Sequence, residues 1–245
     1  MLDNIAPLKI TNLNKNFPGH TVLDDINLEI KEKEIFGLIG LNGAGKTTLI
    51  KIILDLLKAD SGTVEILGIP STTTKSRELL RYLPEKFQVS SMLKGMEFLK
   101  IFSNFNTKKK QTSEKQKEDI NKMADLLSLK KEFLTLKVSK YSKGMVQKLG
   151  LISTFLGESK LIILDEPMSG LDPKARIHLK NLLLESKKSN KSVFFSSHVL
   201  ADIDEICDRI GILNKGKIVF IGTPNELKIK HNELLLEKAF LKEIN

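Results

Sequence analysis

The sequence has one cysteine, no tryptophan and two tyrosines among its 245 residues. The single cysteine, Cys207, excludes an internal disulfide, and because it lies among isoleucines we expect a buried, unreactive thiol in a cytosolic protein. No apolar run approaches the roughly 20 residues of a membrane-spanning helix, and the first residues lack the basic and apolar regions of a signal peptide. We therefore expect a soluble chain, long enough to form one compound domain without disulfides or structural metals.

Positive charge dominates, with 39 Lys and Arg against 30 Asp and Glu, a formal net charge of +9. Lysines crowd the stretch from residue 100 to 148, including Lys108, Lys109 and Lys110. Nucleic acid or an anionic membrane could attract such a stretch, but no aromatic residues interleave as platforms for stacking bases. We favour a solvated helical face and expect no nucleic-acid partner.

Residues 40–47 read Gly-Leu-Asn-Gly-Ala-Gly-Lys-Thr and follow a short apolar run that predicts a buried strand. Apolar residues at helical spacing after this loop predict a helix: Leu49, Ile52, Ile53 and Leu56. A loop between strand and helix surrounds phosphate oxygens with backbone amides, a lysine and a hydroxyl. The pattern predicts a nucleoside triphosphate site, with magnesium on Thr47, formed by Asn42, Gly43, Ala44, Gly45, Lys46, Thr47 and Thr48.

Alternation of predicted strands and helices favours an α/β fold: a P-loop nucleotide-binding core with a parallel sheet, an N-terminal antiparallel β subdomain and a helical insertion. From residue 71 to about 155 the sequence is charged and helical, and strand-like runs almost vanish. Strand character returns at 161–164 and 193–195, on either side of a helix with Asp172 as cap and Pro173 in its first turn. Residues 210–221 look like a closing hairpin before a C-terminal helix.

These boundaries predict a single domain over residues 1–245 with three parts. The parts are a nucleotide-binding core (1–84 and 157–222), a helical subdomain (85–156) and a C-terminal helical tail (223–245).

Two adjacent carboxylates, Asp165 and Glu166, end the apolar run at 161–164. Strand ends in such sheets face the ligand crevice. Asp165 is suited to hold magnesium together with the Thr47 hydroxyl, and Glu166 to orient and deprotonate an attacking water. Two acids that cap the following turn are the alternative, which the phosphate loop disfavours. Together the two motifs predict nucleotide hydrolysis.

With further motifs in the same order, the sequence resembles the ATP-binding subunits of ABC transporters over nearly its whole length. Tyr-Ser-Lys-Gly-Met at 141–145 stands where that family has its signature motif, usually Leu-Ser-Gly-Gly-Gln, and Ser-Gly-Leu-Asp at 169–172 matches its D-loop. Lys143 and Met145 depart from the common form and look like a variant of exporter-type members. The resemblance implies that one subunit contacts the ATP of the other through Ser142, Lys143, Gly144, Met145 and Asp172.

The resemblance also assigns residues around the ATP. His198 matches the switch histidine, which contacts the terminal phosphate and holds the attacking water, and it completes a catalytic set with Glu166 and Lys46. Phe17 occupies the approximate place of the aromatic residue that stacks on adenine, with Val22 beside the ring. Core packing of Phe17 is the alternative.

Glu85 stands where the family's Q-loop commonly has a glutamine that reaches magnesium and senses the membrane partner. A carboxylate can also bind magnesium, so Glu85 is the predicted residue, and Gln88 is the alternative.

The function that the resemblance implies is ATP binding and hydrolysis, with ATP and Mg²⁺ as ligands, by a homodimer or heterodimer that closes around ATP and reopens after hydrolysis. Its partner would be a separate polytopic membrane permease, which places the chain in the cytoplasm, peripheral on the inner face of the cell membrane. Residues 222–227 and 236–242 resemble C termini of exporters of the ABC-2 type. The alternative is a soluble ABC ATPase acting on nucleic acid, in translation or in cofactor assembly.

Overall fold

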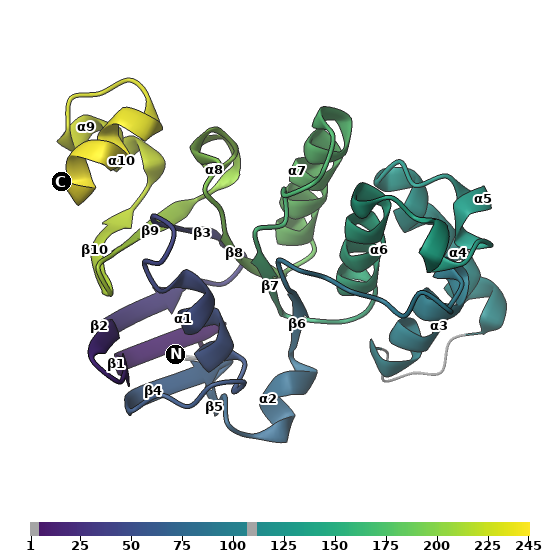
Figure 1. Ribbon diagram of the computed structural model, residues 1–245, viewed down its shortest axis with the longest axis horizontal. Coiled ribbons are helices and arrows are strands. Elements are labelled where there is room, and N and C mark those ends of the chain that lie inside the picture. Colours follow the sequence, from purple (N-terminus) through teal and green to yellow (C-terminus); the bar gives the residue numbers. More distant parts are fainter. Residues whose placement is uncertain (1–4, 107–111) are drawn as a thin grey trace.

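The computed structural model describes residues 5–106 and 112–245, so Lys108, Lys109 and Lys110 lie outside the described residues. Its strands form two sheets (Figure 1). The antiparallel sheet has the order β2-β1-β4-β5 and contains β1 (Leu8–Phe17), β2 (His20–Ile30), β4 (Ser61–Ile66) and β5 (Ile69–Pro70). The larger sheet has the order β10-β9-β3-β8-β7-β6 and contains β3 (Ile35–Ile39), β6 (Leu80–Leu83), β7 (Leu161–Asp165), β8 (Ser192–Ser196), β9 (Arg209–Asn214) and β10 (Lys217–Gly222).

The helices fall into groups around these sheets. The first two are α1 (Lys46–Ile53) and α2 (Thr74–Glu78). A helical end of the molecule, to the right in Figure 1, contains α3 (Gly95–Asn106), α4 (Ser113–Leu126), α5 (Lys131–Leu134), the short 3-10 helix η1 (Val138–Lys140) and α6 (Lys143–Phe155). The remaining helices are α7 (Pro173–Lys188), α8 (Leu200–Ile206), α9 (Pro224–Lys230) and α10 (Leu236–Ile244). None of the helices in the described ranges combines the length and apolar character needed to cross a membrane.

The central strands of the six-stranded sheet, β3, β7 and β8, are buried at every position on both faces, and most of their residues are apolar. In β3, Phe36 and Leu38 pack into the cluster that contains α1 and the antiparallel sheet, whereas Ile35 and Ile39 pack into the cluster that contains α6, α7 and α8. The Phe36 ring stacks on Phe194 of β8, with ring centroids 6.1 Å apart. Because β3, β7 and β8 run parallel, their carboxyl ends meet at one edge of the sheet.

The predicted fold class is confirmed: a phosphate loop follows a central parallel strand, an antiparallel sheet lies at the N terminus, and helices are inserted between β6 and β7. Helix α7 begins where predicted, since the Asp172 side chain accepts a hydrogen bond from Ala175 N at 2.8 Å and Pro173 lies in the first turn. The predicted hairpin is β9 with β10, and two helices follow it.

One strand was not predicted, and one local prediction is wrong. The short strand β6 lies in the segment where strand-like runs were expected almost to vanish, and it pairs in parallel with β7 from Leu80 to Leu83. Only those two end residues of β6 are buried, so the four-residue strand has neither a long apolar run nor alternation. Leu56 does not extend α1, because Asp55 turns into the left-handed region (φ 55°) and leaves Leu56 68% exposed.

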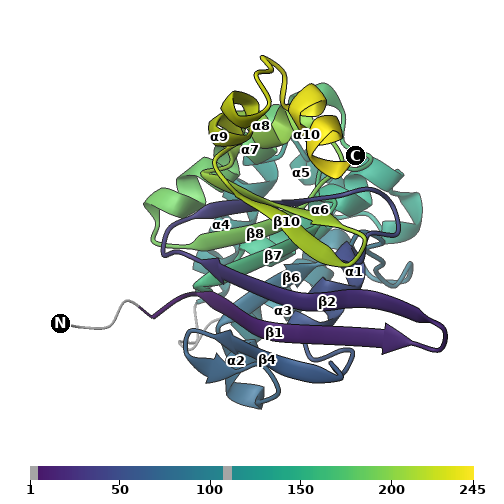
Figure 2. The same ribbon diagram turned by 90° about the vertical axis from the view of Figure 1, so that its left-hand side faces the viewer.

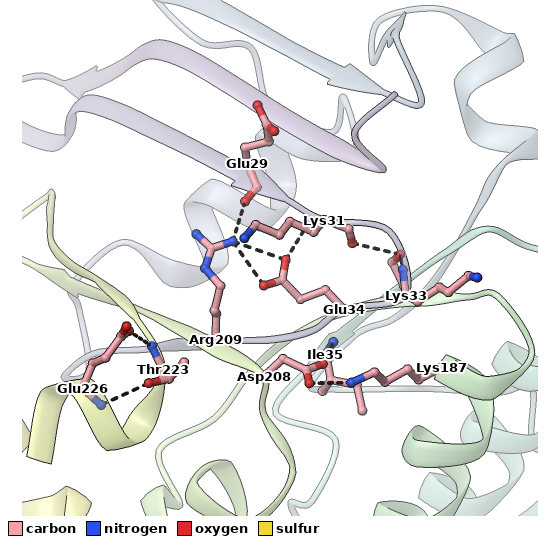
Figure 3. A network of polar contacts seen from close by, with 11 residues as sticks. Glu29, Lys31, Lys33, Glu34, Ile35, Lys187, Asp208, Arg209, Thr223 and Glu226 are labelled. Atoms are coloured by element: carbon pink, nitrogen blue, oxygen red, sulfur yellow. Dashed lines mark hydrogen bonds and ion pairs between the residues drawn. The ribbon is translucent and has the colours of Figure 1, made fainter. Parts of the chain in front are cut away.

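A polar network ties β9 to the ends of β2 and β3 (Figure 3). The Glu34 carboxylate, 4% exposed, accepts hydrogen bonds from Lys31 N at 2.6 Å and from Arg209 Nη1 at 3.1 Å. The same Arg209 nitrogen lies 3.4 Å from the carbonyl oxygen of Glu29, and the guanidinium lies 5.7 Å from the centroid of the Phe36 ring. Arg209 therefore connects both sheets through one buried carboxylate.

Candidate active site

The phosphate loop is set by the strand before it and the helix after it. Gly45, which precedes the first residue of α1, has φ 109°, and a Cβ there would lie 2.9 Å from the carbonyl oxygen of Val22. Only glycine combines that backbone angle with that close approach. Lys46 is 8% exposed, and its ammonium donates to the carbonyl oxygens of Gly40 at 2.8 Å and Leu41 at 3.3 Å. The first turn of α1 thus directs backbone N–H groups toward the loop, an arrangement that binds phosphate.

Asp165 ends β7 beside this loop and is 2% exposed. Its carboxylate accepts hydrogen bonds from Ser196 Oγ at 2.6 Å and from Thr47 Oγ1 at 3.4 Å. Burial raises the pKa of Asp165, and the negative charge of Glu85 adds to that rise, whereas the two hydrogen bonds and the charge of Lys46 oppose it. A cation next to this buried carboxylate would stabilise its charged form.

Glu166 and His198 contact each other at the same edge of the sheet. The Glu166 carboxylate lies 2.7 Å from His198 Nδ1, with side-chain exposures of 13% and 63% respectively. Glu166 has φ 49°, a strained value for a residue with a side chain, and its N–H donates to Ser196 Oγ at 3.0 Å. Ser196 therefore fixes both acidic residues, because its hydroxyl also donates to Asp165. Sequence reasoning missed Ser196, although its place two residues before His198 was a signal.

A cavity of about 600 Å³ joins these elements, a size that suits a small-molecule ligand. Most of the residues predicted to bind ATP and magnesium or to act in hydrolysis line it: Val22, Asn42, Gly43, Gly45, Lys46, Thr47, Thr48, Glu85, Asp165, Glu166 and His198. Further lining residues that sequence reasoning did not assign are Gly40, Leu41, Ser197, Leu200 and Phe240.

Three of the residues considered for the chain's own ATP and magnesium site do not line the cavity. Ala44 is a buried residue of the loop, 9% exposed, and its N–H donates to Leu41 O at 3.1 Å. Phe17, at the end of β1, is 43% exposed, with the Lys15 ammonium 5.4 Å from its ring centroid. This exposure disfavours the alternative that Phe17 packs in the core. Gln88, the alternative to Glu85, also lies outside the lining.

The signature segment and the D-loop pack against each other. Ser142 caps α6, with its hydroxyl accepting from the backbone N–H three residues on at 3.3 Å. A Cβ on Gly144 would lie 3.0 Å from the carbonyl oxygen of Gly170, so a larger residue would crowd this contact. The Lys148 ammonium lies 3.3 Å from the Asp172 carboxylate. None of the five residues predicted to contact ATP across a dimer is among those that line the cavity of their own chain.

The metal ligands offered by this site are oxygens. Within residues 5–106 and 112–245, no group of three or more His, Cys, Asp and Glu side chains is arranged to hold a metal ion. The adjacent Thr47 hydroxyl and Asp165 carboxylate instead fit magnesium, which uses few protein ligands and completes its shell with phosphate and water oxygens.

Known proteins that are similar in sequence are named as ATP-binding proteins of transporters. A family model described as ABC transporter matches residues 23–169. Uncharacterized ABC transporter ATP-binding proteins of Synechocystis sp. and Nostoc sp. are 38% and 36% identical over 206 residues, which cover 84% of this chain. The chain spans only 57% and 61% of the length of these two relatives. The bacitracin transport ATP-binding protein BcrA of Bacillus licheniformis is 34% identical over 231 residues, 94% of this chain and 74% of its own.

Solved structures share the fold. One described as an ATP-binding subunit of an ABC transporter superposes with a TM-score of 0.88 at 27% identity, covering 97% of this chain and 99% of its own. Another, a dimeric ATP-binding cassette with bound ADP and Pi, has a TM-score of 0.81 at 21% identity and covers 88% of this chain and 98% of its own. With the phosphate loop, the paired acids and the histidine at one cavity, these matches show that the chain belongs to the ABC transporter family of ATP-binding proteins.

Proposed function

We propose that the chain binds ATP with Mg²⁺ in the 600 Å³ cavity and hydrolyses it to ADP and phosphate. The observation that carries this proposal is the contact of Glu166 with His198 at 2.7 Å, next to the pair formed by Thr47 and Asp165. A base, its orienting partner and a metal-binding pair then face one volume beside the phosphate loop. That grouping is what phosphoryl transfer to water requires.

The residues around the cavity divide the work of binding and hydrolysis. Lys46 and the amides of residues 42–48 hold the phosphates, and Thr47, Asp165 and Glu85 hold magnesium. Bound magnesium neutralises charge on the terminal phosphates. Glu166 accepts a proton from the attacking water, and His198 contacts the terminal phosphate and keeps that water in line. Phe17 and Val22 lie on the side proposed for adenine.

We further propose that two copies, identical or not, close around two ATP molecules. The signature residues and Asp172 do not line the cavity of their own chain, which supports a contact with ATP held by a second copy. The dimeric state of a structural neighbour is consistent with this arrangement. The core (1–84 and 157–222) would bind ATP, the helical subdomain (85–156) would present the signature segment, and the tail (223–245) would complete the domain.

The closing and reopening of this dimer would drive a polytopic membrane permease, with the chain bound to it at the inner face of the membrane. Export is the favoured direction, because residues 222–227 and 236–242 resemble C termini of ABC-2 exporters, and a relative, 74% of whose length is matched, is named for bacitracin transport. A soluble role in nucleic-acid, translation or cofactor-assembly processes is the competing proposal. Affinity purification from gently solubilised cells separates them: a stoichiometric membrane protein that changes the ATPase rate supports transport, and a ribosome or nucleic acid refutes it.

The Glu166→Gln variant tests hydrolysis and dimer cycling together. It should retain ATP binding, lose about 10²- to 10⁴-fold in hydrolysis rate, and accumulate as an ATP-bound dimer on gel filtration. Glu185→Gln, the same change at an exposed position of α7, is the matched control and should behave as wild type. A Glu166→Gln protein that stays monomeric and hydrolyses ATP at the normal rate would show the proposal to be wrong.

A further inference from the structure

The C-terminal helix α10 reaches the nucleotide cavity, although it lies far from every motif in the sequence. Its buried face consists of Leu236, Ala239 and Phe240, which are 1%, 0% and 6% exposed, whereas Leu241 on the opposite side is 52% exposed. Phe240 lines the cavity together with Leu200 and His198. A large apolar side chain from the last helix therefore borders the same volume as the groups proposed to hydrolyse ATP.

The element between α10 and His198 is helix α8, which packs against α10 (Figure 2). Helix α8 begins at Leu200, two residues after His198. Leu200 is 9% exposed and belongs to the same apolar cluster as Ile203 and Phe240. The turn before α8 is also held by a hydrogen bond from Val199 N to Ser197 Oγ at 3.0 Å. The start of α8 is thus fixed by one short polar turn and by apolar packing shared with α10.

His198 depends on this turn because its own side chain is mostly in solvent. It is 63% exposed, and the contact that orients it is the one with Glu166 at 2.7 Å. An exposed side chain on a short turn keeps its position only if the backbone beneath it is held. Lys46 at the start of α1 and Asp165 at the end of β7 are, in contrast, buried, with exposures of 8% and 2%.

Helix α10 is itself anchored from both directions. Asn214 Nδ2 at the end of β9 donates to the carbonyl oxygen of Ile244 at 3.0 Å. The Glu243 carboxylate lies 2.6 Å from His231 Nε2 and 2.7 Å from the Lys230 ammonium, which joins α10 to the end of α9. These contacts turn the apolar face of α10 toward α8 and keep it there.

We propose that Phe240 is a positioning residue for the hydrolysis of ATP: it packs α10 onto the start of α8 and so holds His198 in place against Glu166. The inference rests on the proposed function, because it assumes that His198 acts in hydrolysis. The C-terminal helix then affects the rate of the chemical step, whereas the phosphate loop sets the affinity for ATP. Loss of Phe240 therefore lowers kcat and leaves the affinity for ATP nearly unchanged.

The test compares Phe240→Ala with Leu241→Ala, the same truncation at the exposed neighbour on the same helix. Phe240→Ala should lower kcat about 10- to 100-fold, since small misplacements of a reacting group cost rates of this order, and should change the Kd for ATP less than about twofold. Leu241→Ala should leave both values unchanged. Phe240→Leu keeps an apolar side chain of similar reach and should therefore retain most of the wild-type kcat. If Phe240→Ala does not fold, Phe240→Leu is the variant whose kcat and Kd are compared with wild type.

A double variant separates positioning from a general loss of structure. In a His198→Ala background, which keeps a residual rate, Phe240→Ala should cause little further loss, because both changes remove the same effect. The inference is overturned if the two losses multiply, if kcat is unchanged, or if Kd rises as much as kcat falls, which would make Phe240 a direct nucleotide contact. A wild-type protein without ATPase activity would instead refute the proposed function itself.

Discussion

Replacing Arg209 with methionine should destabilise the protein through Glu34, the buried carboxylate that Arg209 neutralises. Methionine keeps an apolar stem against Phe36 but removes the guanidinium that lies 3.1 Å from Glu34 Oε1. Within this network Glu34 would then retain only the 2.6 Å hydrogen bond from Lys31 N. A carboxylate that is 4% exposed and has lost its cation carries a large desolvation cost.

The magnitude follows from the exposure of the pair. Removing one partner of a buried ion pair costs about 3–5 kcal/mol. Because the Arg209 side chain is 22% exposed and water reaches one side of the pair, we expect the lower end, about 3 kcal/mol. For a chain of this size that loss corresponds to a fall in Tm of about 6–12 °C. It is a substantial part of a typical total stability of about 5–15 kcal/mol.

The assay is urea unfolding followed by circular dichroism, in which Arg209→Met should lower the midpoint without changing the slope. Glu34→Gln combined with Arg209→Met is the matched control, since the amide carries no charge to leave unpaired, and it should recover part of the loss. The reasoning is refuted if Arg209→Met costs less than about 1 kcal/mol, as an exposed pair would, or if the double variant is no more stable than the single one.

Three further outcomes are expected. Burial raises the pKa of Asp165 above its unfolded value, so the stability that this group contributes is lost as pH rises through the folded-state pKa. Asp165→Asn should therefore raise the nucleotide-free Tm at pH 7, with a smaller gain near about pH 4, and thermal unfolding at both pH values checks this sign. Asp172→Ala removes the cap on Ala175 N and should cost about 1 kcal/mol in urea unfolding, whereas Asp172→Ser should restore most of it. Cys207 is partly buried as a residue, and burial of its thiol raises the thiol pKa, so iodoacetamide at pH 8 should alkylate it far more slowly in the folded protein than in urea; equal rates would show that the thiol is not shielded.

The parts of the site that the sequence predicted are those formed by residues close together in the sequence. The phosphate loop needs glycines next to a lysine, and Gly45 indeed takes φ 109° at the start of α1. Asp165 follows a run of apolar residues that predicted a buried strand, and the run is strand β7. In both cases the neighbours in the sequence are also the neighbours in space, so pattern and structure agree.

The parts that the sequence did not predict depend on contacts between distant segments. Ser196 matters because β8 lies beside β7, which brings its hydroxyl to both Asp165 and Glu166, 31 and 30 residues away. Strand β6 is a strand because β7 offers it hydrogen bonds, although its own four residues carry no strand pattern. Phe240 is spaced like any core residue of an amphipathic helix, and only the packing of α10 on α8 brings it to the cavity.

The groups proposed to bind ATP and the histidine proposed to act in hydrolysis are held in place to different degrees. Of the groups proposed to bind phosphate and magnesium, Lys46 and Thr47 begin helix α1, which packs in the core, and Asp165 ends the buried strand β7. Moving them would therefore disturb many packed contacts. His198 stands on a turn outside that core and is supported by segments near the end of the chain. Because an exposed turn moves more readily than a buried strand, changes in the C-terminal helices should alter the rate of hydrolysis well before they alter ATP binding. A partner that touches α9 or α10 could therefore set the rate without approaching the nucleotide.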